Sequence, residues 1–226
     1  MDLYQDKQEL FKELNNSSTL VIVFGGIKQG LGIPVYEFMN LLRGFKFDKV
    51  FIRDLSQSWY QNGIFEANSI FKLKKRIESI IKQGSYKKVF FIGNSMGGYA
   101  AIMFGSLIGV NEVISFSPQT FLKKSLRKRY KDYRWKDEIL KIKYIFFKRK
   151  ILDLKKLESL IENKNLHIEI HYSLRDRLDS VHAARVKSIK GVTLYPYNFG
   201  NHNLVKELRD KGTLSGILNK KFGNNY

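Results

Sequence analysis

The stretch that most constrains the fold is a Gly-x-Ser-x-Gly motif at residues 93–97. The apolar, β-favouring run 89–92 leads into it, and a helical pattern rich in small residues follows directly. This order of strand, sharp turn and helix is that of a nucleophile elbow, which holds its serine in a strained backbone conformation. Gly93 and Gly97 provide the room that such a turn needs. We therefore expect the Ser95 hydroxyl to stand exposed at the carboxyl end of a buried strand.

Further strand-like runs flank this motif and are separated by stretches with helical spacing. They are residues 19–24, 49–53, 112–116, 166–173 and 192–197. Such alternation predicts an α/β fold with a mostly parallel, doubly wound sheet, and the elbow within it indicates the α/β-hydrolase fold. With 226 residues the chain suits a single domain, 1–226. Residues 2–15 show apolar spacing that predicts an amphipathic helix ahead of the first strand.

Several classes of protein are excluded by composition. The chain has no cysteine, which rules out disulfides, thiolate metal sites and a cysteine nucleophile. Its first residues lack the basic-then-apolar order of a signal peptide, and no apolar run approaches the ~20 residues of a membrane span. We therefore expect a cytoplasmic protein.

The formal net charge of +19 is the unusual feature of the composition. Residues 122–150 carry thirteen Lys or Arg against three Asp or Glu, interleaved with aromatic residues. Because this segment falls between two strands, it predicts a basic helical lid or cap, residues 121–165, that gathers an anionic substrate; a solvated helix face is the alternative. No recognition-helix or RNA-binding signature accompanies the charge, so nucleic acid is not expected as a partner.

Acyl transfer by a serine requires a base and an acid that orients the base. In this fold the order is Ser, then Asp or Glu, then His, each after a strand. Ser95 and His202 fit, because His202 lies in the loop after the last strand. Asp176 and Asp179 both follow the strand 166–173. We favour Asp179, since it begins a helix whose first N–H groups could hold its carboxylate, and keep Asp176 as the alternative.

Other residues around the same sheet edge are candidates for binding. The N–H groups of Met96 and Gly26, with Ile27 next, are the expected oxyanion donors. Gln119, in the loop after the strand 112–116, is a candidate substrate-binding residue. Trp59 and Tyr60 could form the wall of a sugar or acyl pocket, or could pin their loop to the core.

Three polar residues alternate along the strand 166–173, namely His167, Glu169 and His171. Their shared face could suggest a metal site, but polar residues with period two are typical of the solvent side of an edge strand. No further ligand signature joins them, so no metal is expected.

The elbow, the acid and His202 resemble the α/β-hydrolase superfamily over most of the chain. Four stretches further resemble a bacterial group of capsule and surface-polysaccharide O-acetyltransferases: Arg53-Asp54-Leu55, Trp59-Tyr60-Gln61, Phe116-Ser117-Pro118-Gln119 and Asp179-Ser180-Val181-His182-Ala183. The Asp-x-x-His-Ala pattern of that group matches Asp179 and supports it as the acid. The resemblance implies transfer of an acetyl group from acetyl-CoA, a co-substrate rather than a bound cofactor, to a sugar hydroxyl. The positive charge of the chain suits an anionic polysaccharide as the acceptor, and we expect peripheral contact with inner-membrane capsule machinery.

Two other functions remain open at the level of sequence. An esterase or deacetylase would use the same residues with water as the acceptor. A non-catalytic module could use the basic segment alone to bind a polyanion. The complete set of Ser95, an acid and His202 in the expected order favours an enzyme.

Overall fold

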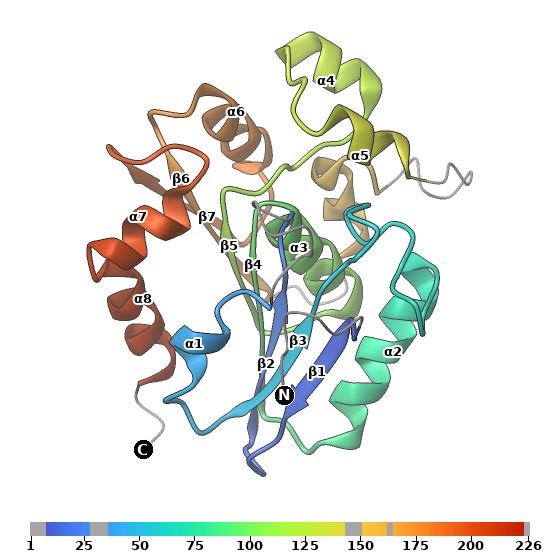
Figure 1. The fold of residues 1–226 in the computed structure, drawn as a ribbon, viewed down its shortest axis with the longest axis vertical. Coiled ribbons are helices and arrows are strands. Elements are labelled where there is room, and N and C mark those ends of the chain that lie inside the picture. The colour runs from blue at the N-terminus through green and yellow to red at the C-terminus, as the bar shows by residue number, and fades with distance from the viewer. Residues whose placement is uncertain (1–7, 28–35, 143–150, 162–164, 224–226) are drawn as a thin grey trace.

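The fold is built on one twisted sheet of seven strands (Figure 1). The computed structural model describes residues 8–27, 36–142, 151–161 and 165–223. In these ranges the strand order is β1-β3-β2-β4-β5-β6-β7, and all neighbours are parallel except β1, which pairs antiparallel with β3. The strands are β1 Leu10–Glu13, β2 Thr19–Phe24, β3 Asp48–Ile52, β4 Lys88–Asn94, β5 Glu112–Phe116, β6 His167–Ser173 and β7 Val192–Tyr197.

Helices cover both faces of the sheet, as a doubly wound topology requires. Side chains of α2 (Ile70–Gln83), α3 (Met96–Ile108), the 3-10 helix η2 (Leu154–Leu160) and α6 (Arg177–Val186) join the larger core cluster on one face. Those of α1 (Met39–Leu42), α7 (Leu204–Asp210) and α8 (Thr213–Phe222) join the cluster on the other. The inner strand β2 is buried throughout, with alternate residues in the two clusters. This is the α/β-hydrolase arrangement expected from the sequence.

The segment between β5 and β6 carries two short helices, α4 (Lys124–Tyr130) and α5 (Lys136–Leu140), followed by η2. Figure 1 shows α4 and α5 standing beyond the carboxyl ends of the strands. We call residues 121–165 the insertion segment; residues 143–150 and 162–164 of it lie outside the described part. Residues 151–161 form a turn and the 3-10 helix η2.

The prediction of a helix over residues 2–15 is wrong where the structure tests it. Leu10–Glu13 form the edge strand β1, and residues 1–7 lie outside the described part. Leu10 pairs with Ile52, and Phe11 with Phe51. The backbone groups of β3 would otherwise be unpaired on that side, and a local apolar pattern does not report this demand.

The turn from β4 to α3 is as strained as the motif predicts. Ser95 has φ +53° and ψ −113°, outside the common regions for a residue with a side chain. A Cβ on Gly97 would lie 2.0 Å from the Phe24 carbonyl oxygen, and one on Gly93 would lie 2.1 Å from the Gly97 carbonyl oxygen. The serine can therefore occupy this turn only while both flanking positions lack side chains.

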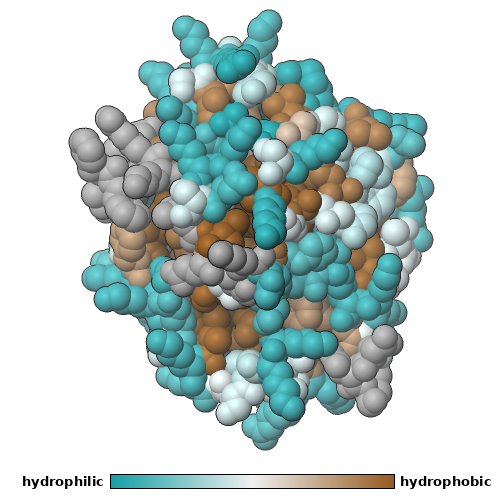
Figure 2. Space-filling view, turned by 180° about the vertical axis from the view of Figure 1, so that it is seen from behind, coloured by the Kyte–Doolittle hydropathy of each residue, from teal (hydrophilic) through white to brown (hydrophobic). Residues whose placement is uncertain are grey.

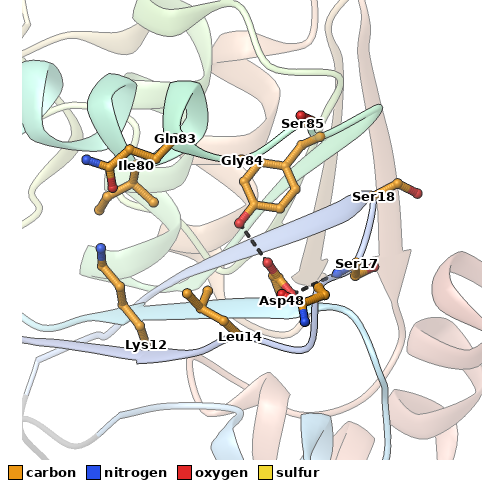
Figure 3. Close-up of a pocket in the computed structure, with 11 residues that line it drawn as sticks. Lys12, Leu14, Ser17, Ser18, Asp48, Ile80, Gln83, Gly84 and Ser85 are labelled. Atoms are coloured by element: carbon orange, nitrogen blue, oxygen red, sulfur yellow. Dashed lines mark hydrogen bonds between the residues drawn. The ribbon is translucent and has the colours of Figure 1, made fainter.

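A hollow opens at the opposite end of the sheet, where β2 and β3 begin (Figure 3). Its polar groups pair with one another: Asp48 accepts from the Tyr86 hydroxyl at 2.7 Å and from the Ser17 N–H at 3.1 Å. The polar groups named here are thus satisfied by hydrogen bonds to one another, and the hollow lies at the end of the sheet away from the elbow. Among the described residues no helix is long and apolar enough to cross a membrane.

The close backbone contact at Gly97 in the elbow can be tested against a glycine that has free space around it. We expect Gly97→Ala to lower the free energy of unfolding by about 1–3 kcal/mol, because the added methyl meets backbone rather than a mobile side chain. Gly216→Ala in α8 is the matched control, since a Cβ there meets nothing within 4 Å and alanine favours a helix. Denaturant unfolding of both variants measures the difference; equal stabilities would contradict the close approach at Gly97.

Candidate active site

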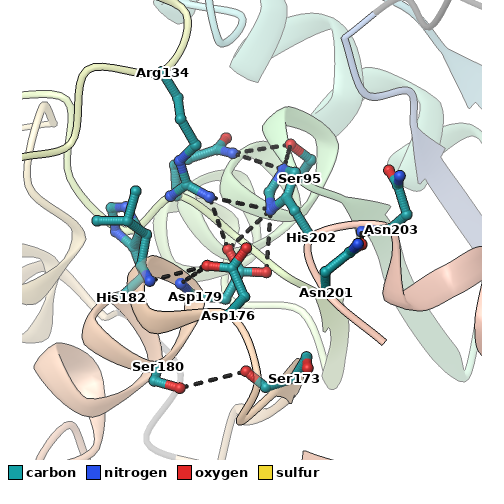
Figure 4. A network of polar contacts seen from close by, with 12 residues as sticks. Ser95, Arg134, Ser173, Asp176, Asp179, Ser180, His182, Asn201, His202 and Asn203 are labelled. Carbon is teal, nitrogen blue, oxygen red and sulfur yellow. Dashed lines mark hydrogen bonds and ion pairs between the residues drawn. The ribbon is translucent and has the colours of Figure 1, made fainter. Parts of the chain in front are cut away.

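Three side chains from separate segments of the chain meet above the carboxyl edge of the sheet (Figure 4). Ser95 Oγ lies 2.9 Å from His202 Nε2, and His202 Nδ1 lies 2.8 Å from Asp179 Oδ1 and 3.1 Å from Oδ2. Ser95 follows β4, Asp179 lies in the first turn of α6 after β6, and His202 lies in the loop after β7. Parallel strands bring these ends to one edge, so residues 107 positions apart become neighbours.

The hydrogen-bond partners decide the state of His202. Because Nδ1 faces a carboxylate, it carries the proton and donates to Asp179, which leaves Nε2 to accept from the Ser95 hydroxyl. Burial would raise the pKa of Asp179, but the hydrogen bond from His202 and the charge of Arg134 outweigh this and hold the pKa below its ordinary value. Asp179 is thus ionised at neutral pH and suited to orient the imidazole.

Asp176 and Asp179, the two candidate acids, have different hydrogen-bond partners in the structure. Asp176 is the N-cap of α6, and its Oδ1 accepts from the backbone N–H groups of Leu178 and Asp179 at 2.9 Å each. Asp179 itself is not held by N-cap donors, as the sequence argument supposed; it lies one turn further and points at His202. The residue favoured from sequence therefore meets His202, but for a different physical reason.

Gln119 lies against the serine. Its Nε2 donates to Ser95 Oγ at 2.9 Å and lies 3.2 Å from His202 Nε2, while its Oε1 accepts from the Trp59 indole at 3.0 Å. Since the indole can only donate, this bond fixes which end of the amide faces Ser95. The donated bond directs the serine hydroxyl proton toward His202.

Trp59 and Tyr60 are both fully buried and present no surface to a ligand. The Tyr60 hydroxyl donates to the carbonyls of Gly25 and Ile52. Asp54 organises their loop, since its Oδ2 accepts from the N–H groups of Ser58 and Tyr60 at 2.7 and 2.8 Å. The geometry thus agrees with the loop-anchoring alternative rather than with a pocket wall.

The two expected oxyanion donors differ in their surroundings. Met96 begins α3 directly after Ser95, where backbone N–H groups point out of the helix. The Gly26 N–H instead bonds the Glu37 carboxylate, which also accepts from the Asn94 side chain at 3.4 Å. Burial raises the pKa of Glu37 to about 7, and these two hydrogen bonds oppose that rise. Ile27, the other candidate donor, is buried next to Gly26.

Three residues outside the predicted site residues support this site. Arg134, from the insertion segment, places Nη1 3.0 Å from Asp179 Oδ1 and 3.3 Å from His202 Nδ1. Asp132 bonds both Arg134 and His182, and His182 is fully buried. His182 of the Asp-x-x-His-Ala pattern was the available signal; the two insertion residues had none.

Within the described part of the chain, two groups of acidic and histidine side chains have spacing that could suit a metal ion. One, formed by Asp176, Asp179 and His202, is part of the site described above. In the other, Glu112, His167 and Glu169, the carboxylates of both glutamates lie against the Lys221 ammonium. The face of β6 is therefore not the solvent side of an edge strand, because β7 lies beyond it and Lys221 of α8 meets it.

Comparison with protein families gives one match that covers more than half of the chain. The model of an uncharacterised protein family, UPF0227, matches residues 53–192, which include the elbow and Asp179 but not His202. A comparison with curated proteins gives no match.

Solved structures with the same fold include acyltransferases and hydrolases. The capsule O-acetyltransferase of Neisseria meningitidis serogroup A superposes with a TM-score of 0.69 at 16% identity, covering 90% of this chain and 88% of that one. A mutant of that enzyme in complex with CoA gives 0.64 at 15% identity, with coverages of 91% and 90%. A fluorophosphonate-binding serine hydrolase of Staphylococcus aureus gives 0.55 at 15% identity, with coverages of 94% and 87%. At these identities the likeness shows the α/β-hydrolase fold.

The different places of the two aspartates predict separable defects. We expect Asp179→Asn to slow labelling of Ser95 by a fluorophosphonate probe by about 10³–10⁴-fold, because an amide cannot hold His202 in the required tautomer. Asp176→Ala removes a helix cap and should cost about 0.5–2 kcal/mol of unfolding free energy with little loss of labelling. Labelling kinetics and denaturant unfolding of both variants measure this; the reverse pattern would make Asp176 the acid.

Glu37 predicts a pH-dependent stability. Because its pKa is raised from 4.5 to about 7 in the folded protein, the folded state keeps this proton over a range where the unfolded chain has lost it. The contribution of Glu37 to stability is therefore fully present below about pH 4.5 and is lost as the pH rises through 7. We expect Glu37→Gln to be increasingly more stable than the wild type from pH 5 to 8, as denaturant unfolding would measure; a constant difference would refute the assignment.

Proposed function

The chain belongs to the uncharacterised protein family UPF0227, and we propose that it is a serine acyltransferase that moves an acetyl group from acetyl-CoA to a hydroxyl of an anionic surface polysaccharide. The observation that carries this proposal is the alignment of Ser95, His202 and Asp179, with 2.9 Å and 2.8 Å between the successive partners. The strained elbow that presents Ser95 supports a nucleophile rather than a structural serine.

In the first half-reaction Ser95 Oγ attacks the thioester carbonyl, and His202 Nε2 takes the hydroxyl proton. Asp179 stabilises the imidazolium that forms. When the tetrahedral intermediate collapses, the carbon–sulfur bond breaks and His202 returns the proton to the thiolate of CoA. The products are acetylated Ser95 and the free thiol.

The second half-reaction reverses the roles. A sugar hydroxyl gives its proton to His202 Nε2 while its oxygen attacks the acetyl carbonyl. The bond to Ser95 Oγ then breaks, and His202 protonates that oxygen. Gln119 assists both halves, because its amide donates to Oγ while the charge on that oxygen changes. The N–H of Met96 is the proposed donor to the carbonyl oxygen.

Charge and fold likeness support an anionic acceptor and a phosphate-bearing donor. The chain carries a net charge of +19, and helix α4 alone holds four basic residues with none of its side chains buried. In the space-filling view, hydrophilic residues cover the end of the molecule that bears α4 (Figure 2). A capsule O-acetyltransferase and its complex with CoA share the fold. These observations favour a polyanionic glycan and acetyl-CoA.

An esterase or deacetylase is the second candidate. The fold is also shared with serine hydrolases such as the fluorophosphonate-binding enzyme of S. aureus, and the same three side chains would use water as the acceptor. The two functions differ in whether water is excluded from the acylated serine.

Acetyl transfer predicts a covalent intermediate that mass spectrometry can detect. After incubation with acetyl-CoA, we expect the wild-type protein to gain one acetyl group and Ser95→Ala to gain none, because Oγ is the acceptor in the first half-reaction. An anionic polysaccharide should remove the adduct and itself become acetylated.

The other outcomes separate the alternatives. An adduct that water removes at the same rate with and without polysaccharide would identify the esterase. No adduct from acetyl-CoA or from any activated ester would overturn the assignment of Ser95 as a nucleophile. Glycan binding by a folded Ser95→Ala protein serves as the control for the acceptor site.

A further inference from the structure

Arg134 is a residue of the insertion segment whose guanidinium lies between two carboxylates. Its Nη1 lies 3.0 Å from Asp179 Oδ1, while its Nε and Nη2 lie 3.1 and 3.2 Å from the two oxygens of Asp132. Burial would lower the pKa of Arg134, but the two carboxylates more than offset this and raise it. The side chain is 20% exposed, so these ion pairs are only partly screened by solvent.

A cation in this place has a cost for the proposed chemistry. Asp179 must stabilise the positive charge that His202 gains when it takes the serine proton, and Arg134 competes for the same carboxylate. Its Nη1 is also 3.3 Å from His202 Nδ1, where both atoms are hydrogen-bond donors. Arg134 alone would therefore disfavour the imidazolium.

Asp132 removes this cost. With Asp132, Arg134 and Asp179 all ionised, the three side chains carry a net charge of −1. The Asp176 carboxylate, held by the N–H groups of Leu178 and Asp179, lies within 4.8 Å of the facing atoms of Asp179 and His202 and faces the imidazolium as well. Burial would raise the pKa of Asp132, but the hydrogen bonds from His182 and Arg134 and the charge of Arg134 hold it well below its ordinary range. Asp132 is thus ionised and offsets the charge of Arg134, so that the charge of Asp179 remains available to stabilise the His202 imidazolium.

His182 fixes the position of Asp132. The Thr120 backbone N–H donates to His182 Nδ1 at 3.0 Å, which requires the ring proton to be on Nε2, and that nitrogen lies 2.9 Å from Asp132 Oδ2. Burial lowers the pKa of His182, so the ring is neutral and donates one hydrogen bond to Asp132.

These contacts form a closed ring around the site, seen in part in Figure 4. From Ser95 the ring runs through Gln119, its chain neighbour Thr120, His182, Asp132, Arg134, Asp179 and His202, and returns to Ser95. Only Asp132 and Arg134 in the ring come from the part of the insertion segment that holds α4 and α5. That part must therefore lie on the site for the ring to close.

We propose that Asp132 and Arg134 are positioning residues that set the charge on the Asp179–His202 pair and make the activity of Ser95 depend on the seating of the insertion segment. This rests on the proposed nucleophilic role of Ser95. The alternative is that the two residues only anchor α4 and α5 to the body of the protein. An anchor would affect stability, but the two single variants would not move the pH dependence of acylation in opposite directions.

The test compares Asp132→Asn, Arg134→Gln and the double variant. Acylation of Ser95 by p-nitrophenyl acetate is followed as a burst over a range of pH, with denaturant unfolding of each protein alongside. Asp137→Asn on α5 is the matched control for Asp132→Asn, and Arg209→Gln on α7 is the matched control for Arg134→Gln. Both control residues are exposed, and their substitutions change the charge by the same amount without removing a residue of the site.

We expect Asp132→Asn to be the slowest variant, by about 10- to 100-fold, because Arg134 is then left to neutralise Asp179. The acid limb of its rate profile should move to lower pH. Arg134→Gln removes the cation beside His202, so its acid limb should move to higher pH. The double variant should recover part of the rate lost in Asp132→Asn.

Three results would decide against the proposal or its premise. Acid limbs that stay where the wild type has them would overturn the positioning role, as would a double variant that is slower than Asp132→Asn. If the folded wild type shows no Ser95-dependent burst with any activated ester, the proposed function itself falls, and this inference falls with it.

Discussion

The close approach of two backbones at the elbow is the constraint on which the site depends. The carbonyl of Phe24 at the end of β2 lies where a Cβ of Gly97 would be, so α3 starts in contact with the neighbouring strand. Ser95 has a strained backbone conformation in this position, and its N–H donates to the Phe116 carbonyl of β5 at 2.8 Å. The backbone at Ser95 is thereby held from both neighbouring strands.

The remaining parts of the site are loops that this edge of the sheet brings together. Asp54 shapes the loop after β3 so that Trp59 lies buried against Gln119, and Gln119 then faces Ser95. On the other side, the turn between α4 and α5 brings Arg134 onto Asp179. Each loop thus fixes one polar atom near the serine or its partners, which is how a rigid sheet can carry a site made of loop residues.

How far the site could be predicted differs from residue to residue. Ser95 could be predicted because the elbow has a local sequence motif, and His202 because it is the one histidine in a loop after a predicted strand. Between Asp176 and Asp179 the sequence favoured the residue that contacts His202, but through helix-capping donors that the structure gives to Asp176. Trp59 and Tyr60 suggested a ligand surface from composition, and only burial revealed that they hold a loop. The segment 10–13 had apolar spacing that suits a helix as well as a strand, and its pairing with β3 decided between them.

The sequence by itself determined the order of the strands from β2 to β7, the elbow, and the positions of Ser95 and His202. These features depend on local patterns, namely buried apolar runs, small residues at a tight turn, and a residue just past the end of a strand. The tertiary structure alone decided the edge strand β1, the acid that meets His202, and the place of Asp132 and Arg134 beside it. These depend on contacts between segments far apart in the chain, where the free energy of pairing a backbone or burying a charge is set by the partner that the fold supplies.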